Sequence, residues 1–347
     1  MPQRPRPTPH TILVRAPNWL GDQILAYPFF YHLRHGYPEA QITVACVPWV
    51  AALQFRHLVD AVCELPPPRT TSAWAKARAL EAHSAMLRAQ GPWDLGLCLP
   101  NAFGAAWLLA RARVRWRRGY RTEARGWLLH EGLDWQPWRS RHRVEAYMQL
   151  LPEAVRPAQA LAAVQLPFDA AVAWPVETPL LPPPAPYWLL APGSLAVSRR
   201  WPLERFAALA KRIAGSTALT GLVVGGSAEA ATARQLCADP ALKLLDYTAR
   251  GAVAMYALLF QQARFTVSND SGLAHVAALC GSPVYIVWGA GNPAITTPWG
   301  PGPVHVLHHA VDCWPCARNV CHQLAARQLA CLHGIHPETV WQALQSC

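Results

Sequence analysis

Short apolar segments alternate with helix-length segments in both halves of this chain, and this alternation constrains its fold most strongly. Residues 11–15 and 41–47 have the composition of buried strands, and residues 23–35 between them that of an apolar-rich helix. The pattern restarts in the second half, with a strand at 187–190 and a helix from 202 to about 213. Strand–helix–strand units pair their strands in parallel, and several of them build a sheet covered by helices on both faces. The sequence therefore predicts two Rossmann-like, doubly wound α/β domains that face each other across a cleft.

A proline-rich stretch separates the two halves. Residues 176–186 read VETPLLPPPAP, which is too rich in proline for a helix and is typical of a stiff, extended linker. A chain of 347 residues is long enough for two domains with a core each. We therefore predict an N-terminal domain over residues 1–170, a linker over 171–186 and a C-terminal domain with a cysteine-containing tail over 187–347. Further strands are expected at 95–99, 219–224, 243–245 and 283–288, and further helices at about 104–111 and 252–262.

The composition favours an anionic partner. Lysine and arginine number 31 against 20 aspartate and glutamate residues, a formal net charge of +11, which suits a nucleotide, a nucleic acid or an acidic lipid surface. The N-terminal residues do not have the pattern of a signal peptide, and no apolar run reaches the roughly 20 residues of a transmembrane helix. We therefore expect the chain to stay in the cytoplasm and its ten cysteines to be reduced thiols.

A strand-to-helix junction at residues 265–278, FTVSNDSGLAHVAA, has the features of a phosphate site. A helix that begins near Ser271 and Gly272 leaves backbone N–H groups free at the positive end of its dipole, where a pyrophosphate would bind. Asp270 is better suited to accept hydrogen bonds from sugar hydroxyls. His275 follows one helical turn after Ser271 and either touches phosphate or is a core-edge histidine bonded to a backbone carbonyl. The alternative for Asp270 or Ser271 is that it only caps the helix.

A second phosphate-binding loop is predicted after the strand at 187–190. Ser194 opens this loop and Arg199 precedes the next helix, so that backbone N–H groups and a guanidinium can meet a nucleotide phosphate there. The alternative is that Arg199 and Arg200 form a solvated surface pair.

Asp22 is the candidate for acid–base chemistry in the first half. It stands in the sequence NWLGD, at the end of the loop after the first strand and at the start of a helix, where a carboxylate would face the cleft. Asn18 and Gly21 belong to the same loop, and Asn101 follows the strand at 95–99, so these three residues are predicted to contact the acceptor substrate. A helix N-cap is the alternative role for Asp22.

Together these segments resemble glycosyltransferase family 9, the bacterial ADP-heptose:lipopolysaccharide heptosyltransferases. The resemblance rests on ILVRAPNWLGDQILAYPFFYHLRHGYPEAQITV, LPNAFGAAWLLARARVRWRRGYRTEARGWLL, APGSLAVSRRWP and SNDSGLAHVAALCGSPVYIVWGAGNP, in the family's order. It implies a GT-B fold and an inverting, metal-independent transfer, with no cofactor, from a nucleotide-sugar donor held mainly by the C-terminal domain. By position, Asp22 matches the proposed general base, Asp270, Ser271 and Gly272 match the donor-binding loop, and His275 matches the motif histidine.

The chain departs from the family pattern in two places. Arg199 stands where the family usually carries lysine, so the positive charge is kept while the contact geometry with phosphate changes. Residues 290–293 read AGNP, where the family tends to carry a Pro-Thr type of sequence. The side chains of residues 290–293 are therefore weaker evidence for how the donor binds.

On this basis the chain is predicted to be an inverting glycosyltransferase that moves heptose from an ADP-heptose donor to the inner core of lipopolysaccharide. Its partners would be the ADP-sugar, the anionic lipopolysaccharide core and, transiently, the cytoplasmic face of the inner membrane, with no nucleic acid. The alternatives are another GT-B enzyme acting on a different nucleotide sugar and a non-catalytic basic protein that binds nucleic acid.

The densest positive stretch of the chain, residues 111–125, is predicted to receive the anionic acceptor. Arg117, Arg118 and Arg121 are its central cations, and neighbouring tryptophans suit the stacking of a sugar or a base equally well. The alternatives are arginines that only keep the protein solvated and arginines that bind RNA.

Four cysteines follow in the C-terminal tail. Cys313 and Cys316 have the C-x-x-C spacing of a zinc site, but the gaps to Cys321 and Cys331 are irregular. The sequence therefore favours packed or surface thiols and no metal, with a structural metal as the alternative.

Overall fold

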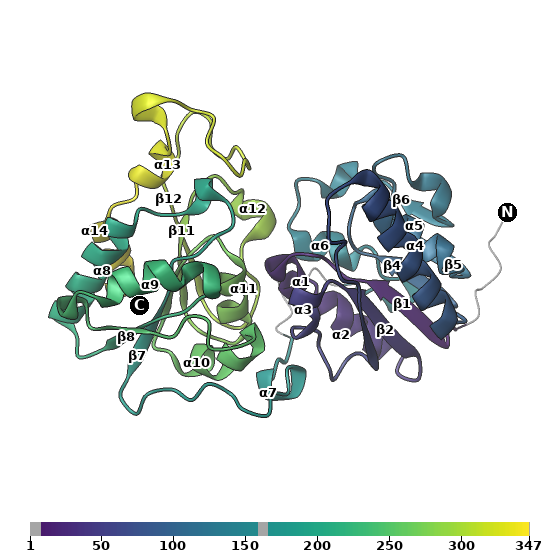
Figure 1. Cartoon of the computed structure of the whole chain (residues 1–347), viewed down its shortest axis with the longest axis horizontal. Helices are drawn as coiled ribbons and strands as arrows, with labels where there is room; N and C mark the ends of the chain where they lie inside the picture. Colours follow the sequence, from purple (N-terminus) through teal and green to yellow (C-terminus); the bar gives the residue numbers. More distant parts are fainter. Residues whose placement is uncertain (1–7, 159–165, 347) are drawn as a thin grey trace. The chain divides into compact units, whose positions relative to one another are not determined.

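A computed structural model of the chain describes residues 8–158 and 166–346 (Figure 1). These residues divide into two compact units. The N-terminal unit comprises residues 8–158 and 172–174, and the C-terminal unit comprises residues 166–171 and 175–346. Each unit contains a six-stranded sheet flanked by helices, so the predicted α/β class is confirmed.

The N-terminal unit alternates strands with helices. Its strands are β1 (Thr11–Arg15), β2 (Gln41–Cys46), β3 (Ala61–Glu64), β4 (Leu95–Cys98), β5 (Trp116–Tyr120) and β6 (Glu131–Leu133). Its helices are α1 (Leu20–Leu25), α2 (Tyr27–Gly36), α3 (Pro48–Ala51), α4 (Ala73–Gln90), α5 (Phe103–Arg111) and α6 (Arg143–Met148). Short 3-10 helices are η1 (Gly126–Leu128), η2 (Gln136–Trp138) and η3 (Glu153–Val155).

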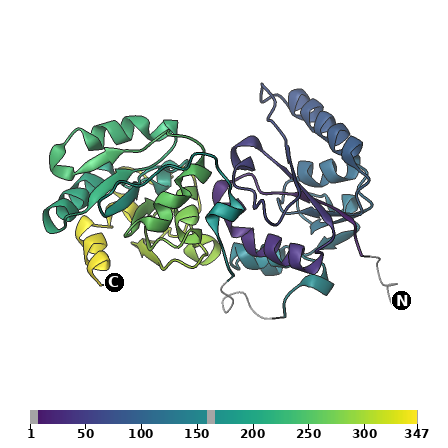
Figure 2. The same cartoon turned by 90° about the horizontal axis from the view of Figure 1, so that it is seen from below.

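The strands of this unit form a parallel sheet in the order β3-β2-β1-β4-β5-β6. This is the strand order of a Rossmann fold. The central strand β4 (LGLC) is buried along its whole length, which explains a continuous apolar run instead of an alternating one. Figure 2 shows α2 and α4 on opposite faces of the sheet. The core on the α4 and α5 side includes Leu13, Leu87 and Leu109.

The C-terminal unit repeats the same plan. Its strands are β7 (Tyr187–Ala191), β8 (Thr220–Val223), β9 (Leu244–Asp246), β10 (Thr266–Asn269), β11 (Val284–Trp288) and β12 (Val304–His308). Its helices are α8 (Leu203–Ser216), α9 (Ala230–Cys237), α10 (Ala257–Gln262), α11 (Gly272–Leu279), α12 (Pro293–Thr296), α13 (Ala330–His333) and α14 (Pro337–Gln345). Short 3-10 helices are η5 (Val197–Arg199), η6 (Ser227–Glu229), η7 (Pro240–Leu242), η8 (Val253–Tyr256) and η9 (Ala325–Arg327).

The second sheet is also parallel, in the order β12-β11-β10-β7-β8-β9. Counted from the first strand of its unit, this order matches that of the first sheet. The C-terminal helix α14 packs against α8 (Figure 1). Their apolar side chains, among them Phe206, Leu209 and Trp341, join one core with the strands. The last helix therefore belongs to the core of the C-terminal unit, whose predicted elements ended at the strand over residues 283–288.

The structure corrects the predicted helix over residues 23–35. This segment lies in two helices, α1 and α2, which meet at Ala26. Pro28 lacks a backbone N–H and lies in the first turn of α2, where a helix tolerates it, so the hydrogen-bond ladder restarts there. Because α1 begins at Leu20, Asp22 and Gly21 lie inside a helix and not in a loop. The N-cap of α1 is Trp19, so the capping role considered for Asp22 is wrong.

The segment between the two sheets contains one short helix, α7 (Ala170–Ala173). Trp174 directly after it is buried and stacks on Phe55 with 6.3 Å between ring centroids. Residues 175–186 contain neither helix nor strand, as their proline content predicts. Within the part of the chain that the structure describes, no helix is both long and apolar enough to cross a membrane.

Candidate functional site

Each sheet reverses its strand order at one point, between β1 and β4 in the N-terminal unit and between β7 and β10 in the C-terminal unit. Ligands of doubly wound sheets bind outside the carboxyl ends of the strands at such a point. Most of the predicted site residues follow these four strands: Asn18, Gly21 and Asp22 after β1, Asn101 after β4, Ser194 and Arg199 after β7, and Asp270, Ser271, Gly272 and His275 after β10. The topology thus brings together, within each unit, residues far apart in sequence.

The Asp22 carboxylate is held by two side chains of α6. Its Oδ1 accepts a hydrogen bond from the hydroxyl of Tyr147 at 3.2 Å, and the Nε of Arg143 lies 3.7 Å from the same oxygen. The Asp22 side chain keeps 27% of its surface exposed. A carboxylate that is fixed on one side and open on the other is arranged to receive a proton from a bound substrate.

The Tyr147 phenol is a permanent donor to Asp22. Burial raises the pKa of Tyr147 well above its ordinary value of 10, and the neighbouring negative charge of Asp22 raises it further. Its hydroxyl therefore stays protonated at neutral pH. Arg143 is held in turn over the ring of Trp135, with 5.4 Å from its guanidinium carbon to the ring centroid.

Asn18 is bonded to a buried arginine at the end of β1. Arg15 is 8% exposed, and its Nη2 donates to the side-chain oxygen of Asn18 at 2.5 Å. Burial lowers the pKa of Arg15 below its ordinary value. The Asn18 carbonyl accepts from the indole N–H of Trp49 at 2.7 Å. The amide oxygen of Asn18 is thus already engaged, which leaves its NH₂ group as the donor that a ligand can use.

Asn101 lies in a loop that Arg125 organises. Arg125 is completely buried, and its Nη1 donates to the carbonyls of Pro100 at 2.6 Å and Ala102 at 2.8 Å. The Asn101 carbonyl accepts from the hydroxyl of Thr122 at 2.6 Å. Its side-chain oxygen is buried without a hydrogen-bond partner among the residues described. Such an oxygen is suited to a ligand donor, because a buried acceptor left unpaired is costly.

The basic stretch that was predicted to receive the acceptor contains β5, an internal strand of the sheet. Arg118 is 3% exposed, pairs with Glu131 and donates to the carbonyls of residues 149 and 150 at 3.0 Å each. Arg117 donates to the carbonyls of residues 114 and 128 at 2.7 and 2.6 Å, and burial lowers its pKa. These bonds use most of the donors of Arg117 and Arg118 within the chain and argue against their predicted contact with the acceptor, which stays a prediction. Arg121, beyond the strand, is exposed.

In the C-terminal unit, the buried Asp270 pairs with Arg199, whose side chain keeps 29% of its surface exposed. Asp270 is 4% exposed, and its Oδ2 lies 3.3 Å from the Nη1 of Arg199. Burial raises the pKa of Asp270, and the charge of Arg199 acts in the opposite direction. The Nε of Arg199 is buried with no hydrogen-bond partner in the described part of the chain. Arg199 is therefore not the solvated surface arginine of the alternative interpretation.

The Asp270 carboxylate leaves no room for a side chain at Gly291. A Cβ atom there would lie 2.3 Å from Oδ2 of Asp270 and 2.9 Å from Nε1 of Trp288, both too close for any side chain. Residues 290–293, which departed from the family pattern, thus lie directly against the Asp270 carboxylate.

Hydrogen bonds join the two loops at the reversal point of the second sheet. Asn269 donates to the Pro192 carbonyl at 2.6 Å and accepts from the backbone N–H of Trp201 at 3.0 Å. The Ser194 hydroxyl donates to the Asp270 carbonyl at 3.1 Å, and Arg200 donates to the Ser194 carbonyl at 2.6 Å. Ser194 therefore shapes the loop through its hydroxyl, a role that the sequence did not predict.

The helix α11 starts without a side-chain cap. Ser271 occupies the N-cap position in an extended conformation, and no side-chain oxygen accepts from the first turn. The alternative that the side chain of Asp270 or Ser271 merely caps this helix is therefore wrong. The N–H groups that begin at Gly272 remain at the positive end of the dipole for an anion. His275, in the same helix, is 5% exposed and lies at the edge of the core.

The sequence matches the description "Glycosyltransferase family 9 (heptosyltransferase)" over residues 82–326. The chain belongs to this family. Lipooligosaccharide heptosyltransferase 2 of Haemophilus ducreyi is 26% identical over 314 residues, covering 83% of this chain and 85% of that protein. Lipopolysaccharide heptosyltransferase 2 of Salmonella typhimurium is 28% identical over 320 residues with the same coverage. Family membership makes the chain a glycosyltransferase.

Solved structures of the family share its fold. ADP-heptose lipopolysaccharide heptosyltransferase II of Escherichia coli matches with a TM-score of 0.74 at 22% identity, over 97% of this chain and 98% of that one. The E. coli heptosyltransferase WaaC with ADP matches with the same TM-score at 18% identity, over 97% and 99%. The predicted GT-B fold class is confirmed by these likenesses.

Sequence reasoning missed Arg15, Arg143 and Tyr147 in this glycosyltransferase. Arg15 carried a signal, since a cation that ends an otherwise apolar strand needs a polar partner. The two residues of α6 carried none, because 125 positions separate Tyr147 from Asp22 and only the fold joins them.

Proposed function

We propose that the chain is an inverting glycosyltransferase that moves heptose from ADP-heptose to the inner core of lipopolysaccharide. The family and the names of its relatives support this substrate class. The structural observation that carries it is the uncapped start of α11 beside the buried carboxylate of Asp270 and its partner Arg199. This arrangement combines donors for a pyrophosphate with a carboxylate for a sugar.

The donor would bind in the C-terminal unit. The pyrophosphate would accept hydrogen bonds from the first N–H groups of α11 and from the Arg199 guanidinium. As the glycosidic bond breaks, negative charge grows on the leaving ADP, and these preorganised donors would stabilise it. Asp270 would then accept hydrogen bonds from sugar hydroxyls, and Ser194, Ser271, Gly272 and His275 would maintain the shape of the loop.

Asp22 would be the general base. The acceptor hydroxyl attacks the anomeric carbon on the face opposite ADP, the bond to ADP breaks, and Asp22 takes the hydroxyl proton. An aspartate with an ordinary pKa of about 3.9 is a weak base at neutral pH, so the proton transfers late, as the new bond forms. The fixed orientation given by Tyr147 and Arg143 would keep the carboxylate in position for this step.

The proposed acceptor site excludes most of the basic stretch. Asn18, Gly21 and Asn101 stay in it by their place at the reversal point, and Arg121 is its exposed cation. A lipid-linked acceptor also implies transient contact with the cytoplasmic face of the inner membrane. The nucleic-acid alternative loses its main support, since Arg117, Arg118 and Arg125 bond to backbone carbonyls.

Incubation with ADP-heptose and heptosyl-Kdo-lipid A tests the proposal. We expect stoichiometric ADP release and an acceptor that gains the mass of one heptose, with both slowed about 100-fold or more in the Asp22→Asn variant. ADP release without a change in acceptor mass, or transfer from a different nucleotide sugar in preference to ADP-heptose, would contradict the assignment of substrates.

A further inference from the structure

The outer surface of α4, α5 and η1 in the N-terminal unit carries tryptophans that the fold leaves in contact with water. Trp74 on α4 is 71% exposed and Trp127 on η1 is 70% exposed, although tryptophan is highly buried in most folded proteins. Trp107 on α5 is half-buried beside them. The helices α4 and α5 lie side by side (Figure 1). We call the surface formed by Trp74, Trp107 and Trp127 the aromatic face.

A ring contact and an ion pair join these tryptophans into one surface. The rings of Trp107 and Trp127 meet edge to face, with 6.4 Å between their centroids. The guanidinium carbon of Arg111 lies 5.9 Å from the centroid of Trp107, and Arg111 pairs with Glu81 of α4 at 2.6 Å. Glu81 follows Trp74 by two helical turns, so both side chains project from the same side of α4. The aromatic face is therefore continuous from α4 across α5 to η1.

The outward side of α4 is mostly apolar, and its charges are mostly positive. The residues opposite its buried Ser84 and Leu87 recur at helical spacing and are all exposed: Trp74, Arg78, Ala82, Ala85 and Ala89. The helix carries three cations, at positions 76, 78 and 88, against the single carboxylate of Glu81, which Arg111 already neutralises. Arg78 lies over the Trp74 ring at 5.5 Å. Exposed indoles and cations on an apolar helix face are typical of segments that lie in the headgroup region of an anionic bilayer.

The aromatic face borders the proposed acceptor site. Phe103 follows Asn101 by two positions, and its ring centroid lies 6.4 Å from that of Trp127. On the other side of Trp127, a Cβ atom on Gly126 would lie 3.3 Å from Cγ of Arg121, so the stem of Arg121 passes directly beside η1. A molecule bound at Asn101 and Arg121 would therefore continue onto the aromatic face.

We propose that the aromatic face seats the N-terminal unit on an anionic lipid bilayer. Its three tryptophans would lie at headgroup depth, and the arginines beside them would meet lipid phosphates. The inference rests on the proposed function with its lipid-linked acceptor, whose sugars would reach Asn101 and Arg121 while its acyl chains stay in the bilayer. A nucleic acid suits this surface less well, because the outward alanines of α4 offer it neither a stacking ring nor a hydrogen bond, whereas a bilayer buries them.

Cosedimentation of the full chain with lipid vesicles tests the proposal without reference to catalysis. We expect binding to vesicles of phosphatidylglycerol and phosphatidylethanolamine that exceeds binding to phosphatidylcholine vesicles and weakens with salt. Trp74→Ser and Trp127→Ser should each lower partitioning about tenfold, because an indole then no longer leaves water on binding. Arg78→Gln should lower it about fivefold. Leu181→Ser is the matched control, because this side chain is 71% exposed but belongs to the C-terminal unit, so its binding should equal that of wild type.

Both tryptophans are exposed, so the variants should keep the wild-type melting temperature. Trp74→Ser should also keep the wild-type constants with a soluble acceptor that lacks acyl chains, and raise the KM for the acceptor embedded in vesicles. Failure of the wild type to transfer heptose would contradict the proposed function but leave the vesicle measurement valid. Vesicle binding that both tryptophan variants retain would overturn the inference. So would an RNA affinity or a self-association of the chain that these substitutions abolish while vesicle binding persists.

Discussion

Replacing Tyr147 by phenylalanine removes one oxygen atom from beside the proposed base. In the structure this oxygen donates to Asp22 Oδ1 at 3.2 Å from a buried ring that phenylalanine can fill with the same packing. The Arg143 Nε remains 3.7 Å from the same carboxylate oxygen, so Asp22 keeps its charged neighbour but loses its neutral donor. The variant therefore tests the orientation of Asp22 without abolishing its charge.

The size of the effect follows from the bond that is lost. A hydrogen bond to a charged group contributes about 1.5–3 kcal/mol, and about 1.4 kcal/mol corresponds to a factor of ten in rate. Because Arg143 still restrains the carboxylate, we expect the lower end of this range, about a tenfold fall in kcat. The KM for ADP-heptose should hardly change, since the residues proposed to bind the donor belong to the other unit.

Steady-state ADP release, measured across pH with saturating donor, is the assay. The acidic limb of the rate profile should move to higher pH in Tyr147→Phe, because an ionised carboxylate that loses a donor is protonated more readily. Tyr120→Phe is the matched control, because its hydroxyl also bonds to α6 but donates to the Ala146 carbonyl, 2.6 Å away, and not to Asp22. Equal effects of the two substitutions, or an unmoved profile in Tyr147→Phe, would refute the role in positioning the base.

Substitutions at three further residues test the proposed roles directly. Asp22→Asn keeps the volume but not the basicity, and should lower turnover about 100-fold or more while calorimetry shows unchanged ADP binding; turnover like that of the wild type would exclude Asp22 as the base. Asp270→Ala should weaken ADP-heptose binding by about 1.5–3 kcal/mol and leave ADP alone nearly unaffected; equal weakening of both would mean that Asp270 only shapes the loop. Arg199→Lys should retain most activity, whereas Arg199→Ala should raise the donor KM and lower kcat, and an Ala variant with wild-type constants would contradict phosphate binding by Arg199.

Local sequence predicted most of the central strands because their surroundings are uniform. The segments that became β1 and β7 are buried from both sides over most of their length, so each reads as a short apolar run followed by a polar turn. The residues after those strands were candidates for the site for the same reason, since the carboxyl ends of parallel strands face the ligand. Fold and site could thus be inferred together wherever a strand was recognised.

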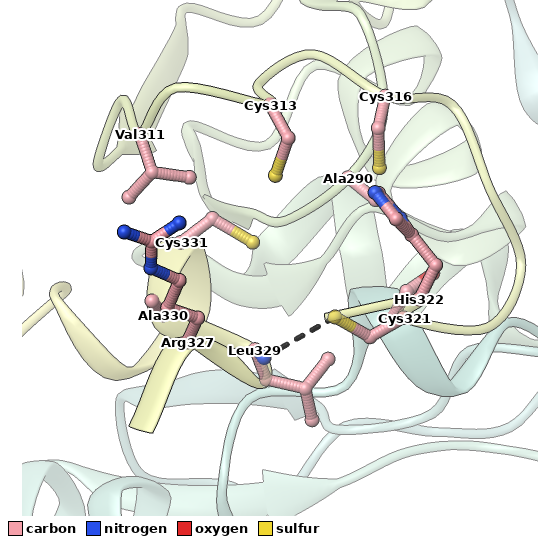
Figure 3. A pocket seen from close by; sticks show the side chains of 11 residues that line it. Ala290, Val311, Cys313, Cys316, Cys321, His322, Arg327, Leu329, Ala330 and Cys331 are labelled. Atoms are coloured by element: carbon pink, nitrogen blue, oxygen red, sulfur yellow. Dashed lines mark hydrogen bonds between the residues drawn. The ribbon is translucent and has the colours of Figure 1, made fainter. Parts of the chain in front are cut away.

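Interactions between distant segments explain what the sequence did not reveal. The strand β5 reads WRRGY, a pattern that looks exposed until the carbonyls of residues 128, 149 and 150 supply acceptors for Arg117 and Arg118. The helix predicted over residues 23–35 has a local reason instead: Pro28 lacks a backbone N–H, so a second helix starts at Tyr27. The clustering of Cys331 with the cysteines of the preceding loop (Figure 3) depends on where α13 packs, which no spacing rule encodes.

The buried arginines change what the net charge of +11 means for binding. Arg15, Arg118 and Arg125 are 8%, 3% and 0% exposed, and each bonds to groups of the chain itself around the ends of β1, β4 and β5. These buried arginines fix the loops at the reversal point of the sheet. They contribute little to binding an anion, because an arginine whose N–H groups already donate to carbonyls has few donors left for a phosphate.

Salt dependence of acceptor binding should therefore reflect exposed cations such as Arg121. Arg121→Gln should raise the acceptor KM at low ionic strength, and the difference from wild type should shrink above about 0.3 M salt, where exposed charges are screened. An unchanged KM at low salt would mean that the acceptor meets this unit through neutral hydrogen bonds at Asn18 and Asn101 instead of through charge.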